Sequence, residues 1–210
     1  LDDLVAGLVW PELDVAIVPG VADDAGDCAD VMRGEEVQLL GAVAAGLIPA
    51  DCQVCHPGTH NKWAQVAGGR IAAFRTVMTG ELFNLLKEHS ILADLLGPDA
   101  EPGEPFASGV RRGLDGDGIQ AELFSVRARV LLGKARSEDA AAFTSGLLIG
   151  SDVRIGLSTG RGGGAVIVMG RPELTELYAA AVAIAGHEAV ELDGEQCFLA
   201  GAGQIAERIT

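Results

Sequence analysis

Two short polar segments carry side chains whose types and spacing could transfer a phosphoryl group. Arg33, Gly34, Glu35 and Glu36 open an apolar helical stretch, where a carboxylate could act as a general base toward a hydroxyl group. A carboxylate at a helix start can equally serve only to satisfy the helix dipole. About twenty residues later, segment 57–62 (PGTHNK) joins two strand-like segments and could surround a phosphate with backbone N–H groups, a hydroxyl and a basic side chain. An ordinary polar hairpin turn would have the same composition.

A second motif, Cys52, Cys55 and His56, matches the C-x-x-C-H pattern of covalent haem attachment. The segment predicts a strand, in which residues three apart point to opposite faces, so the two thiols could not both reach one haem. A zinc site from these residues and His60 is disfavoured because structural zinc normally takes two separated ligand pairs, and the other cysteines, Cys28 and Cys197, are single. We interpret the cysteines as buried thiols and assign no metal ligand.

Two glycine-rich segments also resemble ligand loops. Residues 160–164 (GRGGG) look like a dinucleotide loop, but they precede the apolar strand 165–169 instead of following one, which is the wrong order for a Rossmann site. Residues 115–118 (DGDG) lack the later acidic positions of an EF-hand, so they predict a turn between two helices.

Composition limits the class of protein. The 210 residues include 15 basic and 30 acidic side chains, a net charge of −15, which disfavours nucleic acid and anionic membranes as partners. The apolar fraction of 49% against 21% charged residues indicates a folded globular chain. No apolar run approaches the roughly 18–20 residues of a membrane span, and the first residues lack the basic start of a signal peptide, so we expect a cytoplasmic protein.

The hydrophobic pattern predicts an α/β protein in which strands and helices alternate late in the chain. We expect strands at 13–18, 53–55, 165–169 and 189–192, and a hairpin whose arms meet at Gly68-Gly69. The strand at 13–18 should be buried in a mixed sheet. Thr79 should cap a long helix that buries leucines through Leu96. The other helices are expected at 35–46, 104–114, 118–132, 137–149, 173–185 and 195–209, with a domain boundary in the linker 48–51.

Three longer stretches, 30–41, 57–63 and 74–83, resemble the 2-dehydro-3-deoxygalactonokinases, in that family's order and spacing. The similarity continues through 89–92, 145–150 and 199–201, so it covers nearly the whole chain. The resemblance implies an actin-like ATPase (ribonuclease H-like) sugar kinase fold, with the second domain complete and the first truncated. Residues 1–50 would be the remnant of the first domain with a connecting helix. Residues 51–210 would form the second, nucleotide-binding domain, with the helix at 195–209 packing back on the first.

The resemblance also implies an activity: ATP-dependent phosphorylation of 2-dehydro-3-deoxy-D-galactonate at its terminal (6-) hydroxyl, in galactonate catabolism. The implied cofactors are ATP and Mg²⁺, and the implied partners are small molecules, with a homo-oligomer left open. The catalytic base would be Glu35, with Glu36 as second choice. The other implied contacts are phosphate-binding (Gly58, Thr59, His60 and Lys62), substrate-binding (Arg33, Arg75, Thr79, Gly80 and Glu81) and nucleotide-binding (Gly146, Gly150 and Gly170). Close helix packing explains Gly146 and Gly150 equally well.

One departure from the family is plain. Its members begin with an Asp-x-Gly-Thr or Asp-x-Gly-Ser hairpin that helps hold Mg²⁺ and the ATP phosphates, and this sequence has no such motif. Because phosphoryl transfer depends on the placement of metal and charge, we expect little catalysis from these 210 residues alone. The alternatives are a non-catalytic module or fragment that binds a nucleotide or sugar acid, and a redox or haem protein that uses Cys52 and Cys55.

Overall fold

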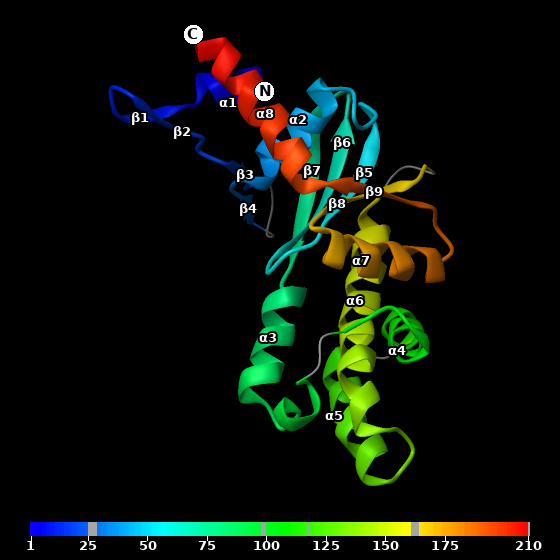
Figure 1. Ribbon diagram of the computed structural model, residues 1–210. Helices are drawn as coiled ribbons and strands as arrows, with labels where there is room; N and C mark the ends of the chain where they lie inside the picture. Colours follow the sequence, from blue (N-terminus) through cyan, green and yellow to red (C-terminus); the bar gives the residue numbers. More distant parts are fainter. Residues whose placement is uncertain (25–28, 98–99, 117, 161–163, 210) are drawn as a thin grey trace.

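The computed structural model describes residues 1–24, 29–97, 100–116, 118–160 and 164–209. Its centre is a mixed five-stranded sheet with the strand order β7-β6-β5-β8-β9 (Figure 1). The first three strands form an antiparallel meander, and β8 and β9 continue the sheet parallel to β5. The strands span Cys52–His56 (β5), Asn61–Ala67 (β6), Arg70–Val77 (β7), Val166–Gly170 (β8) and Ala189–Asp193 (β9). The α/β class predicted from the sequence is therefore correct.

The turn between β6 and β7 confirms the predicted hairpin. Gly68 and Gly69 have φ values of +56° and +73°, which side chains other than glycine rarely adopt. The turn is held at both positions, because the Gly69 N–H donates to the carbonyl of Ala50 and the Gly68 N–H donates to the Asp51 carboxylate. This register places Lys62 opposite Thr76 and Trp63 opposite Arg75.

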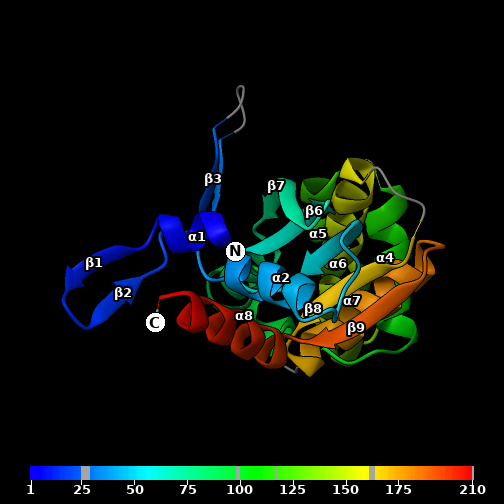
Figure 2. The same cartoon turned by 90° about the horizontal axis from the view of Figure 1, so that it is seen from above.

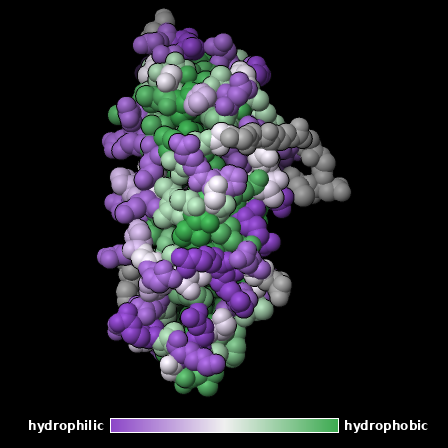
Figure 3. Space-filling model, turned by 90° about the vertical axis from the view of Figure 1, so that its right-hand side faces the viewer, coloured by the Kyte–Doolittle hydropathy of each residue, from purple (hydrophilic) through white to green (hydrophobic). Residues whose placement is uncertain are grey.

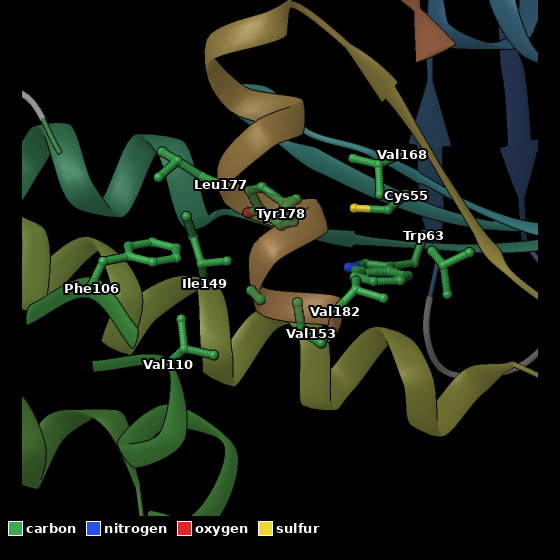
Figure 4. Close-up of a cluster of buried hydrophobic side chains, with 12 residues drawn as sticks. Cys55, Trp63, Phe106, Val110, Ile149, Val153, Val168, Leu177, Tyr178 and Val182 are labelled. Carbon is green, nitrogen blue, oxygen red and sulfur yellow. The ribbon is translucent and has the colours of Figure 1, made fainter. Parts of the chain in front are cut away.

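Helices cover both faces of the sheet, as Figures 1 and 2 show. Helices α2 (Glu35–Ala44) and α8 (Gly194–Ile209) lie side by side on one face. They approach closely because each contributes a glycine: a Cβ on Gly41 would lie 2.4 Å from the Gly201 backbone. Helices α6 (Ala140–Thr159) and α7 (Pro172–Ile184) cover the other face, where Trp63, Val153 and Tyr178 share a buried cluster (Figure 4).

The remaining helices form an extension beyond one end of the sheet (Figure 1). It contains α3 (Thr79–His89), α4 (Glu104–Asp115), α5 (Ile119–Leu131) and most of α6, together with the short 3-10 helices η1 (Ala93–Leu95) and η2 (Ser137–Asp139). The contact between α4 and α6 is close along its length. An added Cβ would lie 2.1 Å from the Phe106 carbonyl at Gly146 and 2.3 Å from the Val110 carbonyl at Gly150. The predicted connection between two helices lies where expected, since α4 ends at Asp115 and α5 begins at Ile119, and Asp117 lies outside the described residues.

The N-terminal elements project from the body in both ribbon views. They are α1 (Asp2–Ala6) and two antiparallel hairpins, β1 (Val9–Glu12) with β2 (Val15–Ile17) and β3 (Val21–Asp23) with β4 (Asp30–Met32). The prediction of a buried strand at 13–18 is wrong. Leu13 is 95% exposed at the hairpin turn, and Val15 and Ile17 are exposed on β2. An apolar run predicts a strand but not what packs against it, and here the two-stranded ribbon has no covering layer among the described residues.

Two predicted helices have different bounds. The helix expected from Thr79 to Leu96 ends at His89, because Ser90 is extended and its hydroxyl donates to the Leu86 carbonyl while accepting the N–H of Leu92. Thr79 is not the cap: it is the first helical residue, and its hydroxyl donates to Asp152 instead. The helix expected at 137–149 begins at Ala140 and continues to Thr159. It then precedes β8, so the order that argued against a Rossmann loop is confirmed, although residues 161–163 lie outside the described residues.

Figure 3 shows the face on the right-hand side of Figure 1, where hydrophobic patches are interrupted by hydrophilic side chains. Among the described residues, none of the helices is both long and apolar enough to cross a membrane.

Candidate functional site

The turn between β5 and β6, residues 57–60, lies among three hollows of the surface. Gly58 and Thr59 line a hollow of about 340 Å³ between α3, α6 and α7. Gly58 also lines one of about 380 Å³ near α8 and the start of α7. His60, together with Lys62 on β6, lines a third of about 520 Å³ beside the start of α2. We call these the helical, the rear and the acid hollow. The turn is thus the one segment of the described chain that borders all three.

The acid hollow brings together a carboxylate and a buried amine. Glu35 begins α2, and its Oε1 lies 4.0 Å from the Lys62 Nζ. The Lys62 side chain is only 6% exposed, and its ammonium donates a 2.8 Å hydrogen bond to the Thr76 hydroxyl. Thr76 is in turn fixed by Asp30, which accepts from both its N–H and its hydroxyl. This chain of contacts aims a positive charge at the hollow that Glu35 lines.

The two neighbouring glutamates have different environments. Glu35 lines the acid hollow, and one of its oxygens accepts the Arg33 N–H at 3.1 Å. Glu36 is fully buried: its Oε2 accepts the Gly34 N–H, while its Oε1 has no hydrogen-bond partner among the described residues. Burial raises the pKa of Glu36, against the opposing effect of hydrogen bonds from backbone N–H groups. Of the two acids, only Glu35 faces space that a substrate could occupy.

Other predicted residues gather around the same hollow. Arg33 lines it, and the His60 ring contacts the Glu81 carboxylate from the first turn of α3. The N–H of Glu81 donates to the Thr59 carbonyl, so this N–H of the α3 start is not free for an anion. The start of α3 packs tightly on the turn, since a Cβ on Gly80 would lie 2.4 Å from the Gly58 carbonyl.

Arg75 is not brought together with these residues. It pairs with Trp63 in the sheet, and Trp63 lies in the cluster that faces α6 and α7, so Arg75 projects from the face opposite Lys62. It is exposed and lines none of the three hollows. The structure therefore places Arg75, predicted to bind substrate, and Lys62, predicted to bind phosphate, on opposite faces of the sheet.

The helical hollow is lined largely by apolar side chains of α3, α6 and α7, including Phe83, Leu148, Ile149 and Leu174. The predicted nucleotide residues Gly146 and Gly150 do not line it. They face α4, which favours the packing interpretation that the sequence left open. Gly170 ends β8 and lines the rear hollow, with the Pro57 ring 3.5 Å from where its Cβ would be.

A buried carboxylate that the sequence analysis missed lies beneath the turn. Asp152 on α6 is 1% exposed and accepts hydrogen bonds from side chains of three other elements. The donors are Asn61 and Trp63 on β6, Thr79 on α3 and Tyr178 on α7. Burial raises the pKa of Asp152, and these four hydrogen bonds oppose that rise. No local motif marks Asp152, because its donors are separated along the chain by 26 to 91 residues. Only the isolated carboxylate within an apolar helix could have signalled it.

Cys55 and Cys197 are buried thiols as predicted, whereas Cys52 is only partly buried. Cys55 packs in the cluster facing α6 and α7, whereas Cys52 packs against the cluster facing α2, so the two point to opposite faces as predicted. Burial raises the pKa of Cys52 to about 11 and that of Cys55 well above its usual value. Cys28, considered above for zinc, lies outside the described residues. Within the described ranges no group of three or more His, Cys, Asp or Glu could hold a metal ion.

Two curated proteins are similar to this chain over most of its length. A 2-dehydro-3-deoxygalactonokinase from Escherichia coli K12 is 38% identical over 196 residues, and a Rhizobium meliloti protein provisionally named 2-dehydro-3-deoxygalactonokinase DgoK1 is 37% identical over 200. Each match covers 93% of this chain but only 66% and 65% of those relatives, so the chain spans slightly less than two thirds of their length.

A solved structure shows the same fold. A crystal structure of a Sinorhizobium meliloti protein, provisionally assigned as a 2-dehydro-3-deoxygalactonokinase, superposes with a TM-score of 0.91 and 34% identity, over 99% of this chain and 71% of that one. The family model for 2-keto-3-deoxy-galactonokinase matches residues 1–205. The chain therefore belongs to the 2-keto-3-deoxy-galactonokinase family.

Proposed function

We propose that this chain is the part of an ATP-dependent sugar-acid kinase that binds the nucleotide and supplies the general base. The substrate is 2-dehydro-3-deoxy-D-galactonate, phosphorylated at its terminal (6-) hydroxyl. The observation that carries the proposal is the position of the β5–β6 turn, which borders an apolar hollow on one side and the Glu35–Lys62 pair on the other. Membership of the family supports the choice of substrate.

The fold belongs to the same proposal. We assign the chain to the actin-like, ribonuclease H-like sugar kinase fold that the family resemblance implies, and the strand order β7-β6-β5-β8-β9 is the feature offered in support. Residues 51–210 would be the second domain of that fold, and residues 1–50 a part of the first with the connecting helix α2. In this division α8 packs back on α2, the connecting helix that carries Glu35, and both helices cover the sheet of the second domain.

The residues around the turn have different roles in the proposed reaction. Glu35 accepts the proton of the sugar hydroxyl as that oxygen attacks the γ-phosphorus, and the bond between the γ-phosphorus and its bridging oxygen breaks to release ADP. Gly58 and Thr59 approach the nucleotide phosphates, and Lys62 and His60 face the transferred group. Arg33, on the rim of the same hollow, binds the sugar acid. In a chain with a net charge of −15, these local cations offset the repulsion of anionic ligands.

The nucleoside would occupy the helical hollow. Its apolar walls suit a base, and the turn at its edge would receive the phosphates. Gly170 would contact the nucleotide from the rear hollow, which lies on the other side of Gly58. Because ATP is the donor, we propose that the reaction takes place in the cytoplasm.

The described residues do not fit a Mg²⁺ site of their own, because no three His, Cys, Asp or Glu side chains converge among them. Mg²⁺ in phosphoryl transfer commonly binds to substrate phosphates through one or two carboxylates, and nothing in the described geometry selects them. We therefore assign no step to the ion.

The kinase proposal is tested by ADP release in the full-length protein, with and without 2-dehydro-3-deoxy-D-galactonate. Glu35→Gln should lower kcat by about 10²- to 10⁴-fold, the usual contribution of a general base, with little change in nucleotide affinity. Glu88→Gln, an exposed change on α3, is the matched control. Substrate-dependent ADP release that persists at the wild-type rate in Glu35→Gln contradicts the role of Glu35. If Glu36→Gln alone abolishes turnover, the two glutamates have the opposite roles.

A second candidate, ligand binding without turnover by the 210 residues alone, is favoured by the absence of a metal-ligand cluster in the described part of the chain. Calorimetry with ADP beside the same assay separates the two. Binding without ADP release supports the binding module, and release supports the kinase.

A further inference from the structure

We propose that Asp152 is a positioning residue that fixes the side-chain amide of Asn61 and, through it, the β5–β6 turn. Its consequence for nucleotide binding rests on the proposed function. Asp152 lines none of the three hollows around the turn, so it would act only through the residues that it holds.

The two carboxylate oxygens of Asp152 serve different parts of the molecule. Oδ1 accepts the indole N–H of Trp63 at 2.7 Å, within the core. Oδ2 accepts from the Thr79 and Tyr178 hydroxyls, each at 2.6 Å, and from the Asn61 amide. All three partners of Oδ2 line the helical hollow, whereas Trp63 does not. One oxygen therefore faces the core and the other organises the wall of the proposed nucleotide site.

The charge of Asp152 decides which way the Asn61 amide points. An ionised carboxylate only accepts hydrogen bonds, so the amide must direct its Nδ2 toward Asp152. The Tyr178 oxygen receives a hydrogen bond from the same Nδ2. The Asn61 Oδ1 is then directed toward the turn, where it accepts the Gly58 N–H at 2.7 Å. If the amide turned over, an NH₂ group would face the Gly58 N–H, and this bond would be lost.

The turn depends on this bond because Gly58 has no side chain to fix its conformation. An added Cβ at Gly58 would meet nothing within 4 Å, so Gly58 is packed only on its carbonyl side, against Gly80. Its N–H is held by Asn61, and the neighbouring Thr59 carbonyl is held by the N–H of Glu81. These two bonds and the packing of Gly80 on the Gly58 carbonyl hold the turn, and the first bond depends on Asp152 through Asn61.

A buried charge is a costly way to hold a core together, since well-packed apolar residues of similar volume usually stabilise a protein as well or better. Asp152 is buried and linked to three pocket-lining side chains. An arrangement of this kind specifies one geometry of a polar wall, which apolar packing would not do.

The test compares Asp152→Asn with Trp63→Phe in the full-length protein. Asp152→Asn removes the negative charge but keeps the shape, so the Asn61 amide is no longer forced to point Nδ2 toward residue 152. Trp63→Phe removes the hydrogen bond to Oδ1 and part of the buried indole but leaves the partners of Oδ2 unchanged, so it is the control for loss of core stability. Hydrogen exchange at the Gly58 amide, calorimetry with ADP, and KM and kcat for ATP are measured for both.

We expect Gly58 to exchange about 10- to 100-fold faster in Asp152→Asn, and the ADP Kd and ATP KM to rise by a similar factor, the range for a lost hydrogen bond to a charged group. Trp63→Phe should lower the melting temperature without changing the ADP Kd. Asn61→Ala combined with Asp152→Asn should weaken ADP binding no more than Asn61→Ala alone, because both changes break one connection.

Three results would overturn the proposal: unchanged Gly58 exchange in Asp152→Asn, an equal rise of the ADP Kd in Trp63→Phe, or additive effects of Asn61→Ala and Asp152→Asn. A failure of the proposed function is recognised separately. If the wild-type protein neither binds ADP nor releases it from ATP, the kinase proposal fails, while the exchange of Gly58 still decides whether Asp152 positions the turn.

Discussion

Gly156 on α6 is a position where one added methyl group should strongly destabilise the protein. A Cβ at this residue would lie 1.9 Å from the Trp63 indole, which is 1% exposed and packed beneath the helix. To reach an ordinary contact of 3.4 Å, the ring would have to move by about 1.5 Å. The ring has little room to do so, because its N–H is also bound to Asp152.

The expected loss of stability follows from these contacts. Overpacking a filled core costs about 1–3 kcal/mol. A displaced indole would also weaken its bond to the buried Asp152 carboxylate, worth about 1.5–3 kcal/mol. Replacing glycine by alanine within a helix raises stability by about 1 kcal/mol, which offsets part of this loss. Gly156→Ala should therefore destabilise the protein by about 2–5 kcal/mol.

Urea unfolding followed by circular dichroism measures this change. Gly203→Ala on α8 is the matched control, because an added Cβ there meets nothing within 4 Å, and it should leave stability unchanged or raise it by up to about 1 kcal/mol. If Gly156→Ala unfolds at the same urea concentration as Gly203→Ala, the indole is not packed as described, and the account of the core around Asp152 is wrong.

Three further outcomes are expected. Burial raises the folded-state pKa of Glu36 above 4.5, so the stability that Glu36 contributes is present below its unfolded pKa and is lost as pH rises through the folded pKa. Above about pH 4.5, Glu36→Gln should therefore become more stable relative to wild type. A difference in unfolding free energy that stays constant from about pH 4 to 8 would contradict this expectation. Gly201→Ala would place a Cβ 2.1 Å from the Val37 carbonyl, so the free energy of unfolding measured in urea should fall by about 1–3 kcal/mol. ADP release should also slow, because the displaced helix α2 carries Glu35. Unchanged stability would count against the α2–α8 contact. The thiol of Cys55 should resist iodoacetamide at pH 8 until the protein unfolds, as peptide mass spectrometry can show, and rapid native labelling would revive the redox alternative.

The local features of the fold could be predicted because each depends on neighbours in the sequence. The Gly68-Gly69 pair requires positive φ at both positions, and both are positive. The apolar run before Gly170 is a fully buried strand, β8, as its composition indicates. The opposite directions of Cys52 and Cys55 follow from the two-residue period of a strand.

The failures share a different cause. Residues 13–18 have the pattern of a buried strand, but Leu13, Val15 and Ile17 are exposed because burial depends on what packs against a strand. Threonine is a residue type that commonly caps helices, yet the Thr79 hydroxyl donates its hydrogen bond to Asp152, 73 residues later in the chain. The register with Trp63 also places Arg75 on the face of the sheet opposite Lys62, which no local pattern indicates; its contact with the substrate stays a prediction.

The sequence by itself determined the α/β class, the family resemblance and the two segments proposed for phosphoryl transfer, since these depend on local patterns and ordered motifs. Only the tertiary structure decided between Glu35 and Glu36 as the residue that faces a hollow, because the two are adjacent and differ only in what surrounds them. It alone revealed Asp152, whose partners come from three separate elements. A carboxylate buried among hydrogen-bond donors is defined by contacts across the chain, and those exist only once the sheet and its helices have packed.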